Sequence, residues 1–463
     1  MTASRRVVPS SFRDPSGFLF WEDGTLYRRV SAIYGDDYDH LMQSGLYDSL
    51  VGAGLLVAHE EAPGEDVPSA STYKVLRPEV IPFISYPYEW SFSQLKDAAL
   101  ATLEIQRKAL DFGMSLKDAS AYNVQFTKGK PILIDTLSFE RYREGQPWPA
   151  YRQFCQHFLA PLALMSHRDV RLSQSLRVYV DGIPLDLASS LLPLRTRLSF
   201  PLLTHIHLHA RSQKHFEDRA VDTKGRGVSR LGLLGLVGNL QSAVKKLRWK
   251  PGGTAWAEYY EDASYSEEAL EQKKRIVADF LDRAGPRTVW DLGANVGLFS
   301  RIASGKGMRT ISFDMDPAAV ERNYLDCVEK GETDILPLVL DLANPTPNVG
   351  WANQERMSIL ERGPADAVLA LALVHHLAIG NNLPFSKIAS FLSEICRWLV
   401  VEFVPKTDSQ VQRLLRTRED IFQEYTEQSF LRAFEEYFGV EDSVRIDGME
   451  RTVYLMKRRP SSA

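Results

Sequence analysis

The sequence predicts an α/β protein in which a parallel sheet wrapped by helices follows a separate α+β domain. Two observations support this prediction. In residues 256–459, segments with the period of helices alternate with short apolar segments typical of buried strands. In residues 17–210, strand-like pieces such as 17–30 and helical stretches such as 92–112 form one unit that is dense in aromatic and apolar residues.

Residues 211–253 separate these two parts. The beginning of this stretch is polar and nearly free of apolar residues, which is typical of a linker. Residues 230–250 have the pattern of a basic amphipathic helix, which either lies on a membrane surface or packs between domains with its cations in solvent. We therefore expect an accessory domain in 1–210, a linker and basic helix in 211–253, and a second domain in 254–463.

The helices and strands of the second domain follow one another closely. The pattern predicts, in chain order, a helix at 266–284, a strand at 288–292, a helix at 296–304, a strand at 309–314 and a helix at 317–330. A third strand ends before Asp341, and a very apolar strand occupies 399–404. Ligands of such sheets bind at the carboxyl ends of the strands.

The composition is that of an ordinary folded protein. The chain has 463 residues, of which 44% are hydrophobic and 25% charged, and its formal net charge is −4. This balance excludes a bulk positive field, so no nucleic-acid partner is expected. The three cysteines lie far apart and fit neither a disulfide framework nor a metal knuckle, which favours a reducing cytoplasm.

Neither a secretion signal nor a membrane span is predicted. Residues 1–15 contain arginines but no apolar stretch behind them. The longest apolar run, 231–238, is well short of the roughly 20 residues that cross a bilayer. We therefore expect a cytoplasmic protein without stable membrane insertion.

The most informative stretch is a short apolar strand, 289–292, that runs into a glycine-rich turn and then a helix. In this turn Gly293 lacks the Cβ that would block a ligand, Asn295 tolerates left-handed backbone, and Gly297 lets the helix start close to the sheet. The next strand ends at Asp314, about 20 residues on, which is the spacing at which a carboxylate meets a ribose diol. Together these features predict a ligand-binding turn.

Asp291 indicates the charge of the ligand. It places a carboxylate where dinucleotide-binding folds present a glycine to a pyrophosphate, and an anion at that place would repel phosphates. We therefore expect a cationic or zwitterionic ligand.

The turn resembles the first motif of the class I S-adenosylmethionine-dependent methyltransferases, an acidic residue followed by alternating glycines. Asp291, Gly293 and Gly297 match this motif, while Asn295 replaces its middle glycine. The resemblance implies a Rossmann-like domain with a mostly parallel seven-stranded sheet and helices on both faces. It also implies S-adenosyl-L-methionine as the cofactor.

The same resemblance extends to later positions. It implies that Asp314, with Asp316 as the second choice, binds the ribose hydroxyls of the cofactor. Asp341 follows a strand at the place where this family contacts the adenine amino group, although a simple turn residue is the other interpretation. The cofactor-binding residues are therefore expected to be Asp291, Gly293, Asn295, Gly297, Asp314 and Asp341.

Three residues are candidates for catalysis. Residues 365–377 resemble the family's fourth motif, a buried strand that leads into the catalytic loop, and they end in His375 and His376. A histidine is suited to accept a proton from an acceptor atom, but either ring can instead cap the loop or pack in the core. Glu402 closes an apolar strand, where it either contacts substrate or forms a structural salt bridge.

Residues 256–265, just before the first helix of the second domain, are unusually aromatic. In related methyltransferases such a segment folds over the cofactor and excludes water. Packing of the tyrosines onto the following helix is the equal alternative.

The accessory domain contains a second group of polar residues. Asp118 and Asn123 are spaced like the Asp and Asn of the kinase catalytic loop, and Asp135 follows the next strand, where a metal-binding Asp would lie. The segment resembles the core of a kinase-like fold, but a glycine-rich phosphate loop and a VAIK-like lysine are missing. The alternatives are a hairpin whose polar residues cap turns and, as we prefer, a non-catalytic domain that recognises the acceptor.

Residues 205–209 read His-Ile-His-Leu-His. On a strand the three imidazoles would share one face and form a possible metal triad, whereas on a helix they would splay apart. Carboxylate or cysteine partners at useful spacing are lacking, so no metal site is expected.

Over most of its length the chain, with segments such as SGLYDSL and YRQFCQHFLAPLAL, resembles bacterial nodulation-protein-related methyltransferases. This implies transfer of a methyl group from S-adenosylmethionine by direct displacement. The resemblance does not identify the acceptor, for which we expect a small molecule or a glycan. The alternatives are a non-catalytic cofactor-binding or scaffold protein and an ATP-dependent phosphotransferase that uses the N-terminal domain. The sequence predicts neither the identity of the acceptor nor the oligomeric state.

Overall fold

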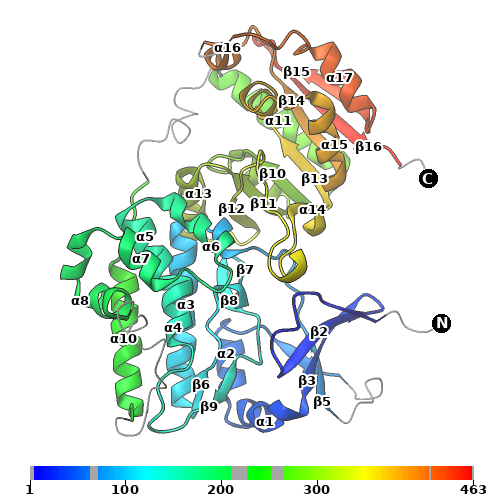
Figure 1. The fold of residues 1–463 in the computed structure, drawn as a ribbon. Coiled ribbons are helices and arrows are strands. Elements are labelled where there is room, and N and C mark those ends of the chain that lie inside the picture. Colours follow the sequence, from blue (N-terminus) through cyan, green and yellow to red (C-terminus); the bar gives the residue numbers. More distant parts are fainter. Residues whose placement is uncertain (1–4, 63–70, 210–226, 252–264, 417–418, 461–463) are drawn as a thin grey trace. The chain divides into compact units, whose positions relative to one another are not determined.

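The computed structural model describes residues 5–62, 71–209, 227–251, 265–416 and 419–460. The chain forms two compact units (Figure 1). Unit 1 consists of Met1–Lys250 and Asn348–Arg356, and unit 2 consists of Pro251–Pro347 and Met357–Ala463. Residues 211–226 and 252–253 of the expected linker lie outside the described residues, so the domain boundaries stay a prediction.

Unit 1 begins with an antiparallel sheet of order β1-β2-β3-β5-β4. Its strands occupy Arg6–Val7 (β1), Gly17–Glu22 (β2), Thr25–Ser31 (β3), His59–Glu61 (β4) and Thr72–Pro78 (β5). β2 and β3 form a hairpin across the strand-like piece 17–30, and the turn residues Asp23 and Gly24 both have positive φ, as a two-residue hairpin loop requires. Two helices, α1 (Gly35–Gln43) and α2 (Leu46–Gly52), follow within this part of the chain.

The long helix α3 (Phe92–Asp111) confirms the helix predicted at 92–112. Ser91 begins it with a capping box, because the Ser91 side chain accepts a hydrogen bond from Gln94 N and the Gln94 side chain accepts one from Ser91 N. Leu95, Leu103 and Leu110 lie on its buried side. This helix supplies much of the apolar core of unit 1.

The basic amphipathic helix α10 (Arg230–Lys246) packs against α3 and belongs to unit 1. Its apolar residues Leu233, Val237 and Leu240 are buried. The Lys96 ammonium holds its end by donating to the carbonyls of Lys245 at 3.1 Å and Leu247 at 2.9 Å. The apolar face of α10 is thus covered by unit 1 itself and is not available to a membrane surface.

Two short antiparallel strand pairs follow α3, namely β6 (Met114–Leu116) with β9 (Phe139–Arg141) and β7 (Val124–Thr127) with β8 (Lys130–Leu133). In the β7–β8 hairpin Lys128 and Gly129 have φ of 50° and 73°, which suits a two-residue turn. The remainder of unit 1 is mainly helical: α4 (Tyr151–Phe154), α5 (Ala160–His167), α6 (Ser175–Val178), α7 (Leu185–Leu191), the 3₁₀ turn η6 (Leu194–Leu198), α8 (Phe200–Leu202) and the π-helical η7 (Leu203–Leu208).

Residues 348–356 lie between strands of unit 2 in the sequence but belong to unit 1. Arg13 holds Glu355 in a bidentate ion pair, with Nη2 2.7 Å from Oε1 and Nε 2.9 Å from Oε2. The Arg356 guanidinium lies 4.3 Å from the centroid of the Tyr122 ring. The sequence did not predict this excursion, because both contacts join residues more than 200 positions apart.

Unit 2 contains a seven-stranded sheet of order β12-β11-β10-β13-β14-β16-β15. Its strands are Thr288–Leu292 (β10), Arg309–Asp314 (β11), Ile335–Val339 (β12), Ala365–Ala370 (β13), Cys396–Phe403 (β14), Phe438–Arg445 (β15) and Thr452–Arg458 (β16). Neighbouring strands from β12 to β14 run parallel, and β16 is antiparallel to both of its neighbours. The mixed α/β architecture expected here is confirmed.

Helices cover both faces of this sheet (Figure 1). On one face α11 (Glu267–Ala284) and α12 (Leu298–Ser304) place Phe280 and Phe299 in a core with Val400. On the other face α17 (Glu427–Glu435) places the Phe430 ring 5.2 Å from that of Phe403. The remaining helices are α13 (Pro317–Lys330), α14 (Ile359–Arg362), α15 (Phe385–Ile395) and α16 (Ser409–Leu415).

The predicted helices at 266–284 and 317–330 are confirmed by α11 and α13. The helix predicted at 296–304 begins at Leu298, because Gly297 has left-handed backbone. Across the described ranges, each helix is too short or too polar to serve as a membrane span.

Candidate functional site

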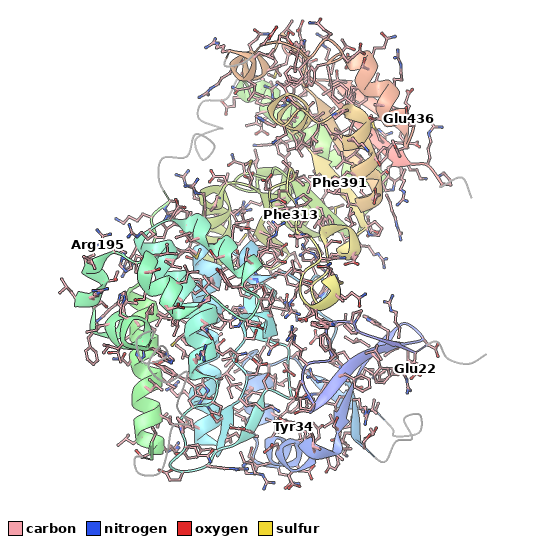
Figure 2. The ribbon with its side chains drawn as sticks, viewed as in Figure 1. Glu22, Tyr34, Arg195, Phe313, Phe391 and Glu436 are labelled. Atoms are coloured by element: carbon pink, nitrogen blue, oxygen red, sulfur yellow. The ribbon has the colours of Figure 1, made fainter. Side chains whose placement is uncertain are left out.

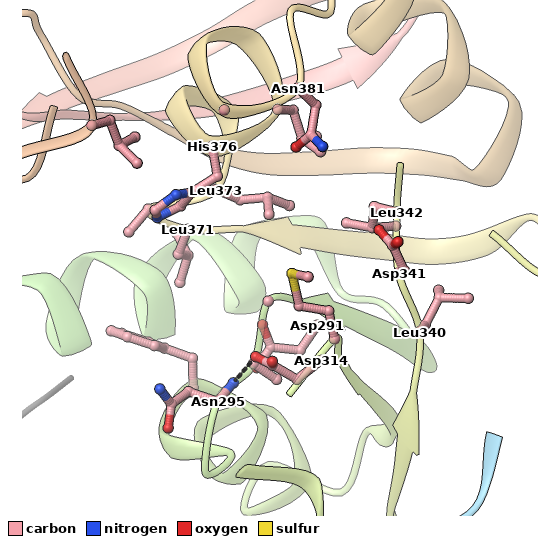
Figure 3. Close-up of a pocket in the computed structure, with 18 of the residues that line it drawn as sticks. Asp291, Asn295, Asp314, Leu340, Asp341, Leu342, Leu371, Leu373, His376 and Asn381 are labelled. Atoms are coloured by element: carbon pink, nitrogen blue, oxygen red, sulfur yellow. Dashed lines mark hydrogen bonds between the residues drawn. The ribbon is translucent and has the colours of Figure 1, made fainter. Parts of the chain in front are cut away.

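A cavity of about 310 Å³ lies in unit 2 at the carboxyl ends of the parallel strands (Figure 3). The turn after β10, the end of β11 and the segments after β12 and β13 form its walls. This is the edge of a parallel sheet at which ligands bind. Of the residues predicted from the sequence, those in the lining are Asp291, Gly293, Asn295, Asp314, Asp341 and His376, and those outside it are Gly297, His375 and Glu402.

The turn after β10 has the backbone that its residues predict. Gly293, Asn295 and Gly297 have φ of 75°, 52° and 81°, all in the left-handed region. A Cβ on Gly297 would lie 2.5 Å from Asn323 Oδ1, so this glycine lets α12 begin against α13. Gly297 therefore shapes the turn from behind, while Gly293 and Asn295 face the cavity.

Two carboxylates face the cavity from neighbouring strand ends. Asp291, at 2% exposure, accepts a hydrogen bond from Ser300 Oγ at 2.6 Å. Asp314 accepts one from Asn295 N and one from Asp316 N, both at 2.8 Å. Burial raises the pKa of each carboxyl to about 6, and the charge of Asp314 adds to the rise at Asp291. Such a pair is stabilised by a ligand that brings positive charge or hydroxyl donors.

The other two aspartates of the prediction lie in different surroundings. Asp341 lines the cavity from the exposed segment after β12, and its Oδ1 accepts a hydrogen bond from Ala343 N at 2.8 Å. It is thus a turn residue that also faces the cavity. Asp316 lies outside the lining and caps α13, because its Oδ1 accepts a hydrogen bond from Ala318 N at 2.9 Å.

Only one histidine of the predicted pair reaches the cavity. His376 lines it, and burial followed by the charge of Arg451 lowers its pKa to about 4. His375 is fully buried beneath it, with the two ring centroids 4.1 Å apart, and burial holds its pKa well below the ordinary value. Both rings are therefore neutral at pH 7, and of the two it is the His376 ring that lines the cavity.

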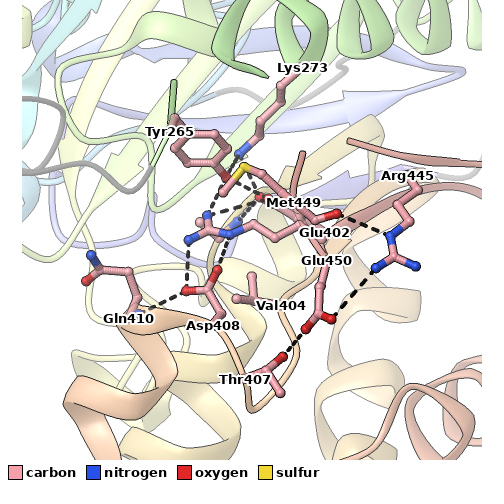
Figure 4. A network of polar contacts seen from close by, with 12 residues as sticks. Tyr265, Lys273, Glu402, Val404, Thr407, Asp408, Gln410, Arg445, Met449 and Glu450 are labelled. Atoms are coloured by element: carbon pink, nitrogen blue, oxygen red, sulfur yellow. Dashed lines mark hydrogen bonds and ion pairs between the residues drawn. The ribbon is translucent and has the colours of Figure 1, made fainter. Parts of the chain in front are cut away.

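Glu402 lies in a buried polar network next to the cavity (Figure 4). It accepts hydrogen bonds from Lys273 Nζ at 2.6 Å, Tyr265 Oη at 2.7 Å and Ala372 N at 2.8 Å. Burial raises its pKa, but the charges of Lys273 and Arg451 outweigh burial and hold that pKa below the ordinary value. Glu402 is therefore an ionised carboxylate whose two oxygens are occupied by protein donors.

Arg451 and Asp408 extend this network. The Arg451 side chain is fully buried and forms a bidentate ion pair with Asp408, at 2.7 Å from Nε and 3.0 Å from Nη2. Arg451 also donates to the Tyr265 hydroxyl. Two cations thus balance two carboxylates around one phenol, as burial requires.

The network has a direct effect on the cavity wall. Ala372 has φ of 49°, a left-handed conformation that a non-glycine residue adopts only under constraint. The constraint here is the hydrogen bond that the Ala372 N–H donates to Glu402. This bend presents Leu371, Leu373 and His376 to the cavity. Glu402 thus acts on the site by holding the loop after β13.

Lys273 and Tyr265 also line the cavity. Lys273 was not predicted from the sequence, whereas Tyr265 belongs to the aromatic segment expected either to fold over the cofactor or to pack onto the following helix. Lys273 lies four residues from both Ala269 and Val277 on the apolar stripe of the predicted helix. A lysine at such a position indicates a buried charge, and this pattern could have identified Lys273 from the sequence. Tyr265 ends the aromatic segment 256–265, whose other residues lie outside the described part of the chain.

The polar residues predicted in the accessory domain gather in unit 1. Asp135 forms an ion pair with Arg28 and accepts hydrogen bonds from Ser138 Oγ at 2.6 Å and Leu137 N at 3.1 Å. Asp118 accepts one from Ser120 N at 2.9 Å, and burial raises its pKa. These carboxylates cap turns, which is the hairpin interpretation, and the kinase-like shape stays a prediction.

Residues 205–209 are not a strand, so the imidazoles do not share a face. His205 Nδ1 lies 2.7 Å from Tyr151 Oη and its Nε2 lies 2.8 Å from Asn239 Oδ1. His207 lies between Ser189 and Thr196. These histidines therefore serve as packing residues with polar partners.

The chain is similar over nearly its whole length to one curated protein, nodulation protein NoeA of Rhizobium meliloti (strain 1021). The two are 36% identical over 459 residues, which cover 97% of this chain and 96% of the relative. No family model matches the sequence.

Among solved structures, magnesium protoporphyrin IX methyltransferase (ChlM) from Synechocystis PCC 6803 with bound SAH has 17% identity and a TM-score of 0.32, covering 44% of this chain and 93% of that chain. WbdD has 16% identity and a TM-score of 0.30, covering 45% of this chain and 43% of that chain. A TehB-like SAM-dependent methyltransferase from Corynebacterium glutamicum has 14% identity and a TM-score of 0.29, covering 44% of this chain and 99% of that chain.

Proposed function

Because this chain belongs to the family of nodulation protein NoeA, with a sequence that resembles S-adenosylmethionine-dependent methyltransferases, we propose that unit 2 binds S-adenosylmethionine and transfers its methyl group. The observation that carries the proposal is the pair of carboxylates, Asp291 and Asp314, that face one cavity from adjacent parallel strands. Burial is the main cause of their raised pKa values, and the charge of a neighbouring carboxylate adds to each, Asp314 at Asp291 and Asp316 at Asp314. A cationic ligand with a ribose diol matches this charge.

The residues around the cavity fit the parts of this cofactor. Asp314 is placed to accept hydrogen bonds from the ribose hydroxyls, and Asp341 from the adenine amino group. Gly293 leaves room for close approach, since a Cβ there would already lie 3.3 Å from Leu373 Cδ1. The apolar walls, which include Phe299 and Leu371, exclude water from the site. Bound here, the cofactor supplies a methyl group on a sulfonium centre.

His376 is the proposed base for the methyl acceptor. It is neutral at pH 7 and lines the cavity, so it can accept the proton that an acceptor hydroxyl or amine loses during transfer. Glu402 holds the loop that carries His376 and is proposed as a positioning residue, not as a base. We propose a small-molecule or glycan acceptor and a cytoplasmic reaction.

Isothermal titration of the full chain with S-adenosylmethionine and S-adenosylhomocysteine tests the proposal. We expect binding of both to the native protein and at least about tenfold weaker binding to Asp314→Asn, since each lost hydrogen bond to a charged group is worth about 1.5–3 kcal/mol. Asp326→Asn, which changes a half-exposed carboxylate on α13, is the matched control. Absence of binding to the native protein would refute the proposal, and binding without methyl transfer to any tested acceptor would favour the scaffold alternative.

A phosphotransferase in unit 1 is the weaker alternative. It requires Asp135 to hold magnesium, whereas both Asp135 oxygens already accept from Arg28, Ser138 and the backbone. We propose instead that unit 1 recognises the acceptor. Magnesium-dependent ATP binding that Asp135→Ala abolishes would support the phosphotransferase alternative.

A further inference from the structure

Beyond the proposed function, we propose that a projecting turn of unit 1, residues 194–200, is a contact site for an anionic lipid bilayer. Three apolar side chains of this turn are exposed, Leu194 at 73%, Leu198 at 90% and Phe200 at 70%. Single exposed apolar residues are ordinary on protein surfaces, but three within seven residues form a patch. At these exposures the side chains project into solvent.

Arginines lie between the apolar side chains of the turn and close to its start. Arg195 and Arg197 alternate with them along the turn, and both are exposed. Figure 2 shows Arg195 at the edge of unit 1. Arg168 and Arg248 are tied to the same region, because Arg168 Nε donates to Leu191 O and Ser166 Oγ donates to Arg248 O at 2.7 Å.

These four arginines differ from the neighbouring basic residue Arg171, whose guanidinium is paired with Asp169 at 2.6 Å. Among the described residues, no carboxylate forms an ion pair with Arg168, Arg195, Arg197 or Arg248. The patch therefore combines apolar tips with guanidinium groups that have no carboxylate partner within the described ranges. An anionic surface complements that charge.

Buried hydrogen bonds hold the turn in place. Thr196 is 2% exposed, and its hydroxyl donates to Pro193 O at 2.7 Å. His207 Nε2, at 2.9 Å, therefore donates to the Thr196 hydroxyl, and Nδ1 accepts from Ser189 Oγ at 2.8 Å. Because the base of the turn is fixed, its exposed side chains can bind with little loss of conformational freedom.

A bilayer interface suits this arrangement better than a groove on a partner does. Apolar tips enter the boundary between headgroups and acyl chains, while guanidinium groups pair with lipid phosphates. The contact would be peripheral and reversible, since three side chains are far fewer than a membrane span needs.

Co-sedimentation of the full chain with vesicles tests the proposal. We expect binding to phosphatidylcholine vesicles that contain phosphatidylglycerol, at least about tenfold weaker binding to phosphatidylcholine alone, and loss of binding in high salt. Two double variants, Leu198→Glu with Phe200→Glu and Arg195→Glu with Arg197→Glu, should each weaken binding by about tenfold or more. The matched controls Ile33→Glu, at a side chain 72% exposed, and Arg107→Glu should bind like the native protein.

Three results would overturn the proposal: no binding to anionic vesicles, equal loss of binding in the controls, or unchanged binding of both double variants. Self-association of the native protein that Leu198→Glu abolishes would also overturn it, because a second copy would then cover the patch. The altered side chains are exposed, so melting temperatures should be unchanged. Binding of S-adenosylmethionine by unit 2 should be unchanged in these variants, which keeps failure here distinct from failure of the proposed function.

Discussion

Lys273 Nζ lies 2.6 Å from Glu402 Oε2 in the interior of unit 2, where the two side chains are 3% and 0% exposed. The pair connects α11 to the end of β14, and Glu402 also holds the loop after β13 through Ala372 N. It therefore joins three parts of the chain that surround the cavity. Forming a buried ion pair of this kind adds little to the free energy of unfolding. Removing only one of its partners lowers that free energy strongly, because the other charge is then buried without a counter-charge.

Glu402→Gln is expected to lower the free energy of unfolding by about 3–5 kcal/mol, because Lys273 and Arg451 lose a buried counter-charge. Urea unfolding measures this change. Glu271→Gln is the control, since it breaks the exposed pair of Glu271 with Lys274 and should cost at most about 0.5 kcal/mol. Similar losses in the two variants would show that the buried network has no special role.

The stability of Asp291→Asn relative to the native protein is expected to increase as the pH rises. The folded pKa of Asp291 is about 6, above the ordinary value near 4, so the folded state binds more protons than the unfolded chain between these values. Stability therefore falls with rising pH in that window, by up to about 3 kcal/mol in all. Asparagine removes this loss.

The measurement for Asp291→Asn is urea unfolding of both proteins at pH 4.5 and pH 7.5. The difference between them should shift in favour of the variant at the higher pH, while its affinity for S-adenosylmethionine falls. A difference that does not change with pH would contradict the raised pKa of Asp291.

Gly297→Ala and Gly307→Ala form a matched pair. Both glycines have left-handed backbone, with φ of 81° and 78°, so both variants incur a conformational cost of about 1 kcal/mol. At Gly307 nothing lies within 4 Å of the added Cβ, whereas at Gly297 it would lie 2.5 Å from Asn323 Oδ1. Thermal unfolding should therefore show that Gly297→Ala is less stable than Gly307→Ala by about 1–3 kcal/mol. Equal losses would mean that α12 shifts freely from α13.

His376→Gln should reduce the rate of methyl transfer by about 100-fold or more, since general bases contribute 10²–10⁴-fold. Its affinity for S-adenosylmethionine should stay nearly unchanged. Transfer of labelled methyl groups from S-adenosylmethionine to a small-molecule extract measures the rate, and titration calorimetry measures the affinity. A native rate in the variant would exclude His376 as the base.

The sequence was sufficient for the elements whose pattern is local. The strands β10 and β11, the helices α11 and α13, and the left-handed backbone of Asn295 follow from alternation of apolar residues and from turn chemistry. The same local patterns were enough to predict that Asp291, Asp314 and Asp341 lie at one edge of the sheet.

The parts that the sequence did not predict depend on distant partners. The burial of Lys273 depends on Glu402, more than 120 residues away, and Glu402 in turn pairs with Arg451 of the last hairpin. His375 and His376 are adjacent and chemically identical, and only the path of the loop after Ala372 separates one in the cavity from one in the core. Tertiary contacts, which leave no periodic signal, decide such positions.

A crystal structure of the full chain with S-adenosylhomocysteine tests the central claim most directly. The proposed function predicts the ligand in the cavity of unit 2, with its ribose hydroxyls within hydrogen-bond distance of the Asp314 carboxylate and its adenine beside Asp341. Ligand bound elsewhere, or bound in this cavity with the ribose turned away from Asp314, would contradict it.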